Sequence, residues 1–231
     1  MADFLLVHGS GFGAWCWPWL TEALTGHGHS ARAIDLPRGP GISLKDQARA
    51  ICDSLTGPTL LVGHSAGGFP ITAAAETDPD KIQALIWLCG YIPGNGSSVA
   101  SRRRSQSEQP LRAALKTDRA SGSYSFAPES LTPLFFHDCP PETRALAARQ
   151  MAPESIAPQE TPLRLTARSQ NLPRFAITCE NDRAIPPAFQ HAMAGAVPPG
   201  HRFSLACGHA PFFARPQETA ALLHRITGLT P

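Results

Sequence analysis

Short apolar runs alternate with longer amphipathic segments over residues 1–90. The apolar runs, which predict strands, cover residues 4–8, 30–35, 59–63 and 84–89. The amphipathic segments, which predict helices, cover residues 14–25, 43–55 and 66–77, the second with Ser43 as its N-cap. Strands and helices in this order form βα units, which build a mostly parallel sheet flanked by helices. The pattern therefore predicts an α/β protein.

The alternation stops after residue 91. Residues 92–165 are rich in Ser, Pro, Arg and Gln and contain only short helical patterns, such as residues 142–151. A structureless loop of this length is uncommon in a compact domain. The βα order then resumes, in the segments 174–179, 187–194, 201–207 and 217–227. We therefore predict a single domain over residues 1–231, with a helical cap, residues 92–165, inserted within it.

Composition narrows the class of protein. With 42% hydrophobic and 16% charged residues in a chain of 231, the sequence is typical of a globular protein. A net charge of +2 gives no strong field for nucleic acid, and we interpret the basic run Arg102 to Arg104 as a solvated loop. The sequence has neither a signal-peptide pattern nor an apolar stretch long enough for a membrane span. We expect no nucleic-acid or membrane partner, and the oligomeric state is not predictable.

Six cysteines are scattered singly along the chain, without a CxxC pair or metal-ligand spacing. This distribution favours a reduced, cytoplasmic compartment. Cys89, Cys179 and Cys207 lie in or beside apolar runs, so we expect small buried side chains there and no metal site.

A candidate nucleophile lies between a predicted strand and a predicted helix. The run Gly63-His64-Ser65-Ala66-Gly67 matches the G-x-S-x-G pattern of a nucleophile elbow. A serine on such a sharp turn has a strained backbone, and the flanking glycines let neighbouring backbone approach closely. The alternative is a glycine-rich turn that binds a phosphate or only connects two elements.

A serine nucleophile requires a histidine as general base and a carboxylate that orients the histidine. His209 fits the base because it follows an apolar strand pattern and a glycine, just before the last predicted helix. The order along this kind of fold is serine, acid, histidine. Glu180 and Asp182 both meet that order after a strand, whereas Asp35 precedes the serine and is interpreted as a loop-capping residue.

A second loop must supply a backbone N–H to the tetrahedral intermediate, together with the N–H of Ala66. His8-Gly9-Ser10-Gly11 follows the first predicted strand and has this position. The whole run from Phe4 to Trp17 resembles the opening of the plant-type esterase and hydroxynitrile lyase branch of the α/β-hydrolases, which includes methyl salicylate esterases. Further matching segments are residues 63–68, 134–142, 178–186 and 208–213. The match is weakest over residues 92–131, in the cap that largely sets substrate choice in this family.

The resemblance implies an α/β-hydrolase fold and assigns the catalytic roles. Asp182 has the position of the family's acid, with Glu180 as the alternative, and Ser10 and Ala66 have those of the oxyanion N–H donors. His8 is expected to hold the oxyanion loop by hydrogen bonding. A small ester is the implied substrate, with aromatic esters and lactones as the candidates, and the mechanism needs neither metal nor cofactor. Candidates for the substrate pocket, each of which could equally belong to the core, are Gly9, Phe12, Trp15, Phe135, Phe136, Ala210 and Phe212.

Two other functions fit the same resemblance. Hydroxynitrile lyases of this branch have Thr or Asn at the position of Gly9, and one subgroup has Lys at the position of Ala210. Gly9 and Ala210 therefore favour an esterase. Gly9 has no side chain to bind a cyanohydrin hydroxyl, and Ala210 has no charge to stabilise departing cyanide. Relatives of this fold have also become small-molecule receptors, and a complete triad argues against that reading without excluding it.

Overall fold

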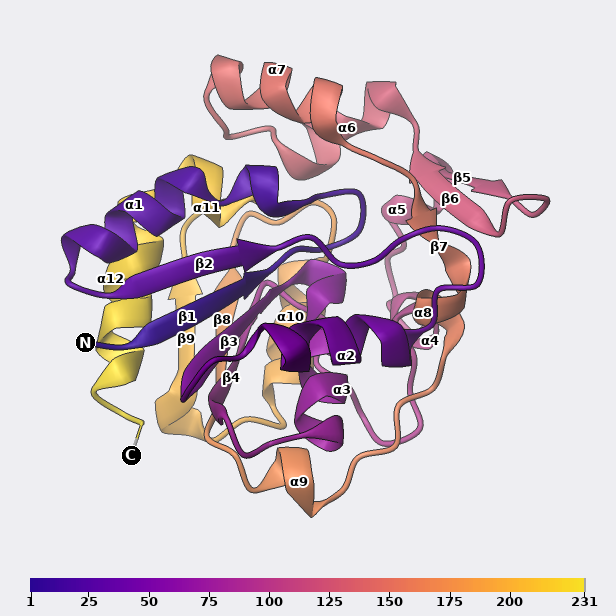
Figure 1. The fold of residues 1–231 in the computed structure, drawn as a ribbon. Coiled ribbons are helices and arrows are strands. Elements are labelled where there is room, and N and C mark those ends of the chain that lie inside the picture. Colours follow the sequence, from indigo (N-terminus) through magenta and orange to yellow (C-terminus); the bar gives the residue numbers. More distant parts are fainter. Residues whose placement is uncertain (231) are drawn as a thin grey trace.

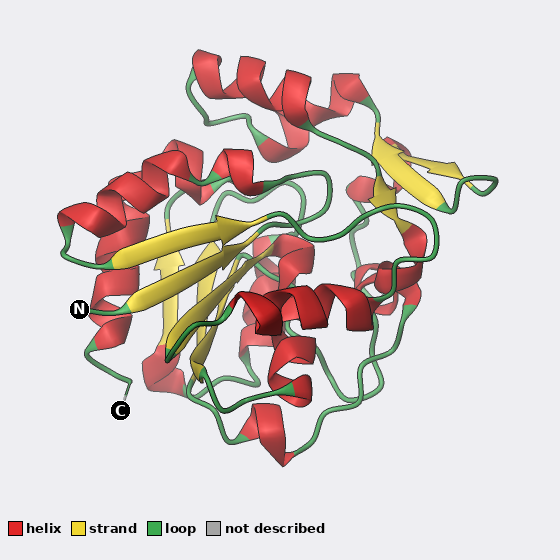
Figure 2. Cartoon of the chain, in the orientation of Figure 1, coloured by secondary structure: helices red, strands yellow, loops and turns green. Residues whose placement is uncertain are grey.

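The centre of the molecule is a six-stranded sheet in which every neighbouring pair of strands is parallel. The computed structural model describes residues 1–230 and gives the strand order β2-β1-β3-β4-β8-β9. The strands are β1 (Asp3–Val7), β2 (Ser30–Ile34), β3 (Thr59–His64), β4 (Ile82–Leu88), β8 (Arg174–Cys179) and β9 (Arg202–Leu205). The predicted parallel sheet is therefore confirmed (Figure 2).

Helices cover both faces of this sheet (Figure 1). Side chains of a strand point alternately to the two faces, so along β1 Phe4 and Leu6 belong to one apolar cluster, Leu5 and Val7 to the other. The first cluster includes side chains of α1 (Pro18–Gly26), α11 (Pro211–Ala214) and α12 (Pro216–Thr227). The second includes side chains of α2 (Leu44–Ser54), α3 (Gly68–Thr77) and α10 (Pro187–Ala194).

Local sequence sets where these helices begin. Ser43 is the N-cap of α2 as predicted, and it forms a capping box with Asp46. The helix predicted over residues 14–25 is instead divided into a 3-10 helix, Ala14–Cys16, and α1. Pro18 explains the division, because proline has no N–H to donate and fits only the first turn of an α-helix.

The inserted segment contains more than helices. Its helices are α4 (Val99–Arg104), α5 (Leu111–Ala114), α6 (Pro128–Phe135), α7 (Pro141–Gln150) and α8 (Ile156–Glu160). A three-stranded antiparallel sheet accompanies them, formed by β5 (Leu115–Asp118), β6 (Ser123–Phe126) and β7 (Glu154–Ser155). The predicted helical cap thus also contains a small sheet, which the sequence did not indicate because its strands are only two to four residues long. We call residues 92–165 the cap; it lies at the top and right of Figure 1.

The basic run in the cap is helical, contrary to the predicted loop. Ser98 caps α4 through a capping box with Ser101, so the arginines occupy the last turn of a short helix. Positive side chains there complement the partial negative charge of the helix carboxyl end. Arg104 also pairs with Glu160 of α8 at 3.1 Å, and both side chains are exposed.

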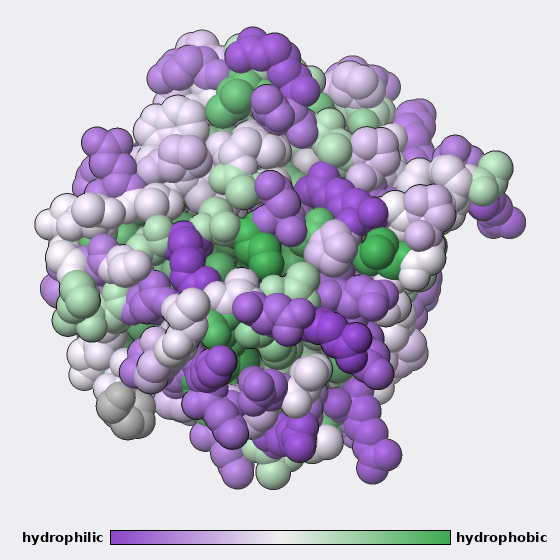
Figure 3. Space-filling model, in the orientation of Figure 1, coloured by the Kyte–Doolittle hydropathy of each residue, from purple (hydrophilic) through white to green (hydrophobic). Residues whose placement is uncertain are grey.

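After the cap, the short helix α9 (Ala167–Gln170) leads the chain back into the sheet at β8, and the 3-10 helix Pro199–His201 precedes β9. The surface seen in Figure 3 is a mixture of hydrophilic and apolar side chains. Among residues 1–230, no helix is long and apolar enough to cross a membrane.

Candidate active site

Ser65 occupies a strained turn between β3 and α3. Its φ of 52° lies in the left-handed region, which is uncommon for a residue with a side chain. The flanking glycines are required by close backbone contacts. A Cβ on Gly63 would lie 2.6 Å from the carbonyl oxygen of Gly67, and a Cβ on Gly67 would lie 2.6 Å from that of His8. The sequence thus folds into the strand, turn and helix that the G-x-S-x-G pattern predicts.

Asp182 and His209 form a buried pair at the ends of β8 and β9. His209 Nδ1 lies 2.7 Å from Asp182 Oδ2, and both side chains are shielded from solvent. The carboxylate also accepts hydrogen bonds from the N–H groups of Ala184 and Ile185, at 2.7 and 2.9 Å, and from Gln190 Nε2 at 2.8 Å. The carboxylate can only accept hydrogen bonds. It therefore selects the tautomer of His209 in which Nδ1 carries the proton.

The two alternative carboxylates have other contacts. Glu180 accepts from the hydroxyl of Thr178 and lies 3.0 Å from Nε2 of the exposed His191. Asp35 accepts a hydrogen bond from the N–H of Ala14 at 2.7 Å, which confirms its interpretation as a loop-capping residue. Asp182 is the carboxylate that the structure brings to His209.

The other ring nitrogen of His209 is free. Nε2 is buried and has no hydrogen-bond partner among residues 1–230. The rings of Phe135 and Phe12 lie 5.4 and 6.5 Å from the imidazole, centroid to centroid, and form an apolar wall around it. Ser65 is itself buried, with 8% of its surface exposed. An imidazole nitrogen that carries no proton and has no partner is able to act as a general base.

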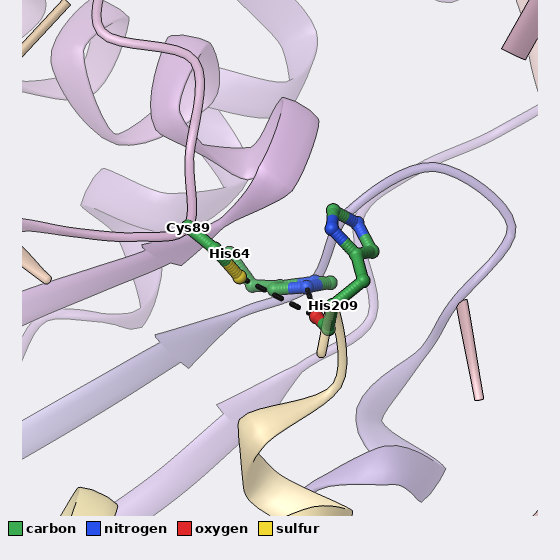
Figure 4. Close-up of side chains that lie close together, drawn as sticks. All are labelled: His64, Cys89 and His209. Carbon is green, nitrogen blue, oxygen red and sulfur yellow. Dashed lines mark hydrogen bonds between the residues drawn. The ribbon is translucent and has the colours of Figure 1, made fainter. Parts of the chain in front are cut away.

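Two side chains hold the backbone of His209. His64 Nε2 lies 2.8 Å from the carbonyl oxygen of His209, and Cys89 Sγ donates to the same oxygen at 3.4 Å (Figure 4). Burial lowers the pKa of His64 well below its usual value and raises that of Cys89 to about 11, so both groups stay neutral. Ligand atoms of the three residues lie within 4.8 Å of one another, the spacing of a possible metal site. His64 and Cys89 instead use their polar atoms to bind the carbonyl oxygen of His209, and so they fix the loop that carries this residue.

The predicted oxyanion loop, His8 to Gly11, is held by the His8 side chain as expected. Its Nδ1 donates to the carbonyl of Gly9 at 2.9 Å, while Nε2 accepts from the N–H of Leu36 at 3.0 Å. Burial, aided by Arg38, lowers the pKa of His8 to about 4, so the ring is neutral and keeps one donor and one acceptor.

The two predicted N–H donors are available. None of the hydrogen bonds formed within residues 1–230 uses the N–H of Ser10. Ala66 lies in the first turn of the 3-10 helix Ser65–Gly67, where backbone N–H groups have no partner within the helix. Both residues line one small cavity beside Gly9.

The aromatic residues predicted for the pocket pack around this centre. Phe12, Phe135, Phe136, Phe212 and Ala210 are buried in the first apolar cluster, and Trp15 packs against it. Phe12 and Phe135 lie beside His209, whereas Phe212 packs on Trp17 and His64. The roles of all seven residues in substrate binding stay a prediction.

A separate cavity lies within the cap. Its volume is about 160 Å³, and its lining is mostly apolar, with Phe126, Leu131, Met151 and the charged Arg144. Met151 and Phe126 also face Gly11, since a Cβ placed on Gly11 would lie 2.6 Å from Met151 Cε and 3.5 Å from Phe126 Cδ2. The cavity therefore borders the predicted oxyanion loop.

Several residues near the site escaped the sequence reasoning. Gln190 holds Asp182, and from the cap His137 Nε2 lies 3.0 Å from the carbonyl oxygen of Asn181, while Asp138 accepts from the N–H of Gly208 at 2.6 Å. His137 and Asp138 belong to the resembling segment 134–142, which was the available signal for them. No local pattern marked Gln190.

Comparison with known proteins identifies a family. The family model described as "Alpha/beta hydrolase family" matches residues 4–222. The chain is 33% identical to "Putative methylesterase 15, chloroplastic" of Arabidopsis thaliana over 99% of its own length, although it spans only 57% of that relative. It is 29% identical to "Methyl jasmonate esterase 1" of Vitis vinifera, with 96% of this chain and 95% of that one covered.

The fold also matches a solved structure. A pyrethroid hydrolase from Sphingobium faniae JZ-2 superposes with a TM-score of 0.88 at 24% identity, covering 98% of this chain and 97% of that one. At this identity the likeness concerns the fold alone.

Proposed function

The chain belongs to the alpha/beta hydrolase family, and from this premise we propose that it is a serine carboxylesterase that hydrolyses a small ester. In this proposal Ser65 is the nucleophile, His209 the general base and Asp182 the acid that orients it. Its similarity to proteins named as methylesterases and as a methyl jasmonate esterase supports ester hydrolysis.

The proposed reaction has two halves. His209 Nε2 takes the proton of Ser65 Oγ, which attacks the ester carbonyl, and the N–H groups of Ser10 and Ala66 stabilise the negative oxygen that forms. The protonated histidine then gives the proton to the departing alcohol. A water molecule, deprotonated by the same nitrogen, attacks the acyl-enzyme and releases the acid.

The observation that carries this proposal is the state of His209. Its Nδ1 is bound to Asp182 at 2.7 Å, while its Nε2 is buried without a partner. A buried polar atom left unpaired costs free energy, so its retention favours a role that requires a free acceptor.

The cap cavity suggests the size of the substrate. A cavity of about 150 Å³ with apolar walls accommodates a molecule as large as benzene, and the cap cavity has about the same volume. We therefore propose an ester with one apolar group of about the size of an aromatic ring. Arg144 lines this cavity and donates its Nε–H to the carbonyl of Cys139, so its remaining N–H groups would pair with a polar or anionic substituent on that group.

Gly9 favours hydrolysis over cyanohydrin cleavage. A Cβ at this position would lie 2.6 Å from Ser65 Cβ and 3.0 Å from His64 Nδ1. The polar side chain that lyases of this branch have here would therefore displace the nucleophile unless the loop moved.

The test is hydrolysis of a panel of methyl, aryl and lactone esters by the wild type, Ser65→Ala and Ser107→Ala. Ser107 is an exposed serine of the cap and is the matched control. We expect Ser65→Ala to lower kcat by about 10³-fold or more, while the control keeps wild-type activity. Full activity of Ser65→Ala would refute the mechanism. Release of cyanide from mandelonitrile without turnover of any ester would support the lyase instead.

A further inference from the structure

The cap contacts the predicted oxyanion loop through two buried side chains. Glu154 of β7 accepts a hydrogen bond from the N–H of Gly11 at 2.9 Å through Oε1. Tyr124 of β6 donates its hydroxyl to Ser10 Oγ at 2.6 Å. The two residues are direct neighbours across the β6–β7 ladder, and each is about 95% buried.

A third contact comes from the backbone. The N–H of Ala152 donates to the carbonyl of Gly11 at 3.0 Å, so the cap binds both the backbone N–H and the backbone C=O of Gly11. Gly11 has a φ of +81°, which glycine adopts without strain. Glycine can also adopt many other backbone conformations, so its own sterics do not fix the loop. The position of the loop is therefore set by its partners.

Glu154 also lies close to the predicted N–H donors. It lines a cavity of about 10 Å³ together with Ser10 and Ala66, a space about large enough for one water molecule. Arg38, from the segment after β2, lies 3.3 Å from Glu154 Oε1 and completes its surroundings.

We propose that Glu154 and Tyr124 are positioning residues for the oxyanion loop, so that the cap influences transition-state stabilisation as well as substrate fit. This inference rests on the proposed function, because it assigns the loop the task of binding the oxyanion. Donors aimed at that oxygen act only if their geometry is fixed before the reaction. Loss of a hydrogen bond to Gly11 would let the N–H of Ser10 move.

The charge of Glu154 adds a pH dependence. Burial raises the pKa of this carboxyl to about 7, although Arg38 and the N–H of Gly11 oppose the shift. Two other titratable groups lie close by, Tyr124 and His8. Burial raises the pKa of Tyr124 and lowers that of His8 to about 4, so neither changes charge near neutral pH. The ionised carboxylate is the stronger acceptor, so the loop is held more firmly as the pH rises through 7.

The experiment compares Glu154→Ala, Glu154→Gln and Tyr124→Phe with the wild type. Glu160→Ala, which removes an exposed carboxylate of the same segment, is the matched control. For an ester of the panel, we expect Glu154→Ala to lower kcat by about 10- to 100-fold with little change in KM. Glu154→Gln keeps an acceptor for Gly11 and should restore most of kcat, and Tyr124→Phe should cost less than Glu154→Ala.

The pH profile separates a positioning role from a merely structural one. The ratio of kcat in the wild type to kcat in Glu154→Gln should rise several-fold from about pH 6 to about pH 8, because the two enzymes differ only at this side chain. A general loss of folded enzyme would reduce the number of active sites and not kcat per site. Labelling of Ser65 with a fluorophosphonate counts these sites. A flat ratio, together with a kcat of Glu154→Ala within about two-fold of the wild type, would overturn the proposal.

Deuterium exchange tests the same inference without any ester. In Glu154→Ala, peptides covering residues 9–12 should exchange faster than in the wild type, and in Glu160→Ala they should not. If the wild type hydrolyses no ester and Ser65 is not labelled, the proposed function fails, but faster exchange would still support the contact between cap and loop. Unchanged exchange in Glu154→Ala would refute it.

Discussion

Two buried carboxylates flank the candidate active site, Asp182 in the core and Glu154 in the cap, and they are held in different ways. Asp182 accepts four hydrogen bonds, all from residues that follow β8 or β9. Glu154 accepts one, from Gly11, and lies beside Arg38 at 3.3 Å.

The difference separates a fixed part of the site from an adjustable one. A carboxylate held by several donors has a fixed position and orients its partner permanently. Glu154 is equally buried but has fewer hydrogen-bond donors than Asp182. Burial raises its pKa to about 7, so its charge changes within the pH range in which many enzymes work. We therefore expect the core to fix the orientation of His209 and the cap to determine how firmly the predicted oxyanion loop is held.

The strongest test of the fixed part is Asp182→Asn. An asparagine would still accept the N–H groups of Ala184 and Ile185, but it would favour the wrong tautomer of His209. We expect kcat to fall by about 10⁴-fold, far more than for any Glu154 variant. Steady-state kinetics with one ester checks this, and equal losses for Asp182→Asn and Glu154→Gln would contradict the comparison.

Gly9→Ala tests the junction between the two parts, where the oxyanion loop passes the nucleophile. The new Cβ would lie 2.6 Å from Ser65 Cβ, so the loop or the elbow must shift. A displacement of about 1 Å costs on the order of 100-fold in rate, and we expect a fall of kcat of that size. Gly26→Ala, at a position with open space around the Cβ, is the control.

Gln190→Leu weakens the fixed part without touching the triad itself. The change removes the donor to Asp182 Oδ2 and leaves the buried N–H of Cys179 without its acceptor. We expect a loss of unfolding free energy of about 1–3 kcal/mol and a fall of kcat of about 10-fold. Urea unfolding and kinetics on the same preparation measure both, and an unchanged Cm would argue against this role.

The smallest expected effect concerns stability and pH. The folded-state pKa of Glu154, about 7, is above the ordinary value of 4.5, so folding favours the neutral carboxyl. The stability it contributes is present below about pH 4.5 and is lost as the pH rises through about 7. Relative to Glu154→Gln, the wild type should lose on the order of 1–3 kcal/mol of unfolding free energy over this range. A constant difference between the two proteins would contradict the raised pKa.

The sequence predicted the fixed part of the site better than the adjustable one. Ser65 follows the apolar run of β3, and His209 follows the short alternating strand β9, so their positions at the sheet edge could be inferred from local pattern and order. The strands of the cap are short and polar, as in Leu115–Asp118, and their pairing depends on partners far along the chain. Gly11 and Glu154 are 143 positions apart, and no local periodicity can reveal such a contact.

The place of the cap in the chain has a consequence for folding. β4 and β8 are neighbours in the sheet, and Leu85 pairs with Arg174 across the whole inserted segment. Ser65 therefore lies in a half of the sheet built from nearby sequence, whereas Asp182 and His209 join it only when a long loop has closed. Because each doubling of such a loop costs only about 0.6 kcal/mol, the cap can change in length at little cost to the sheet beneath it.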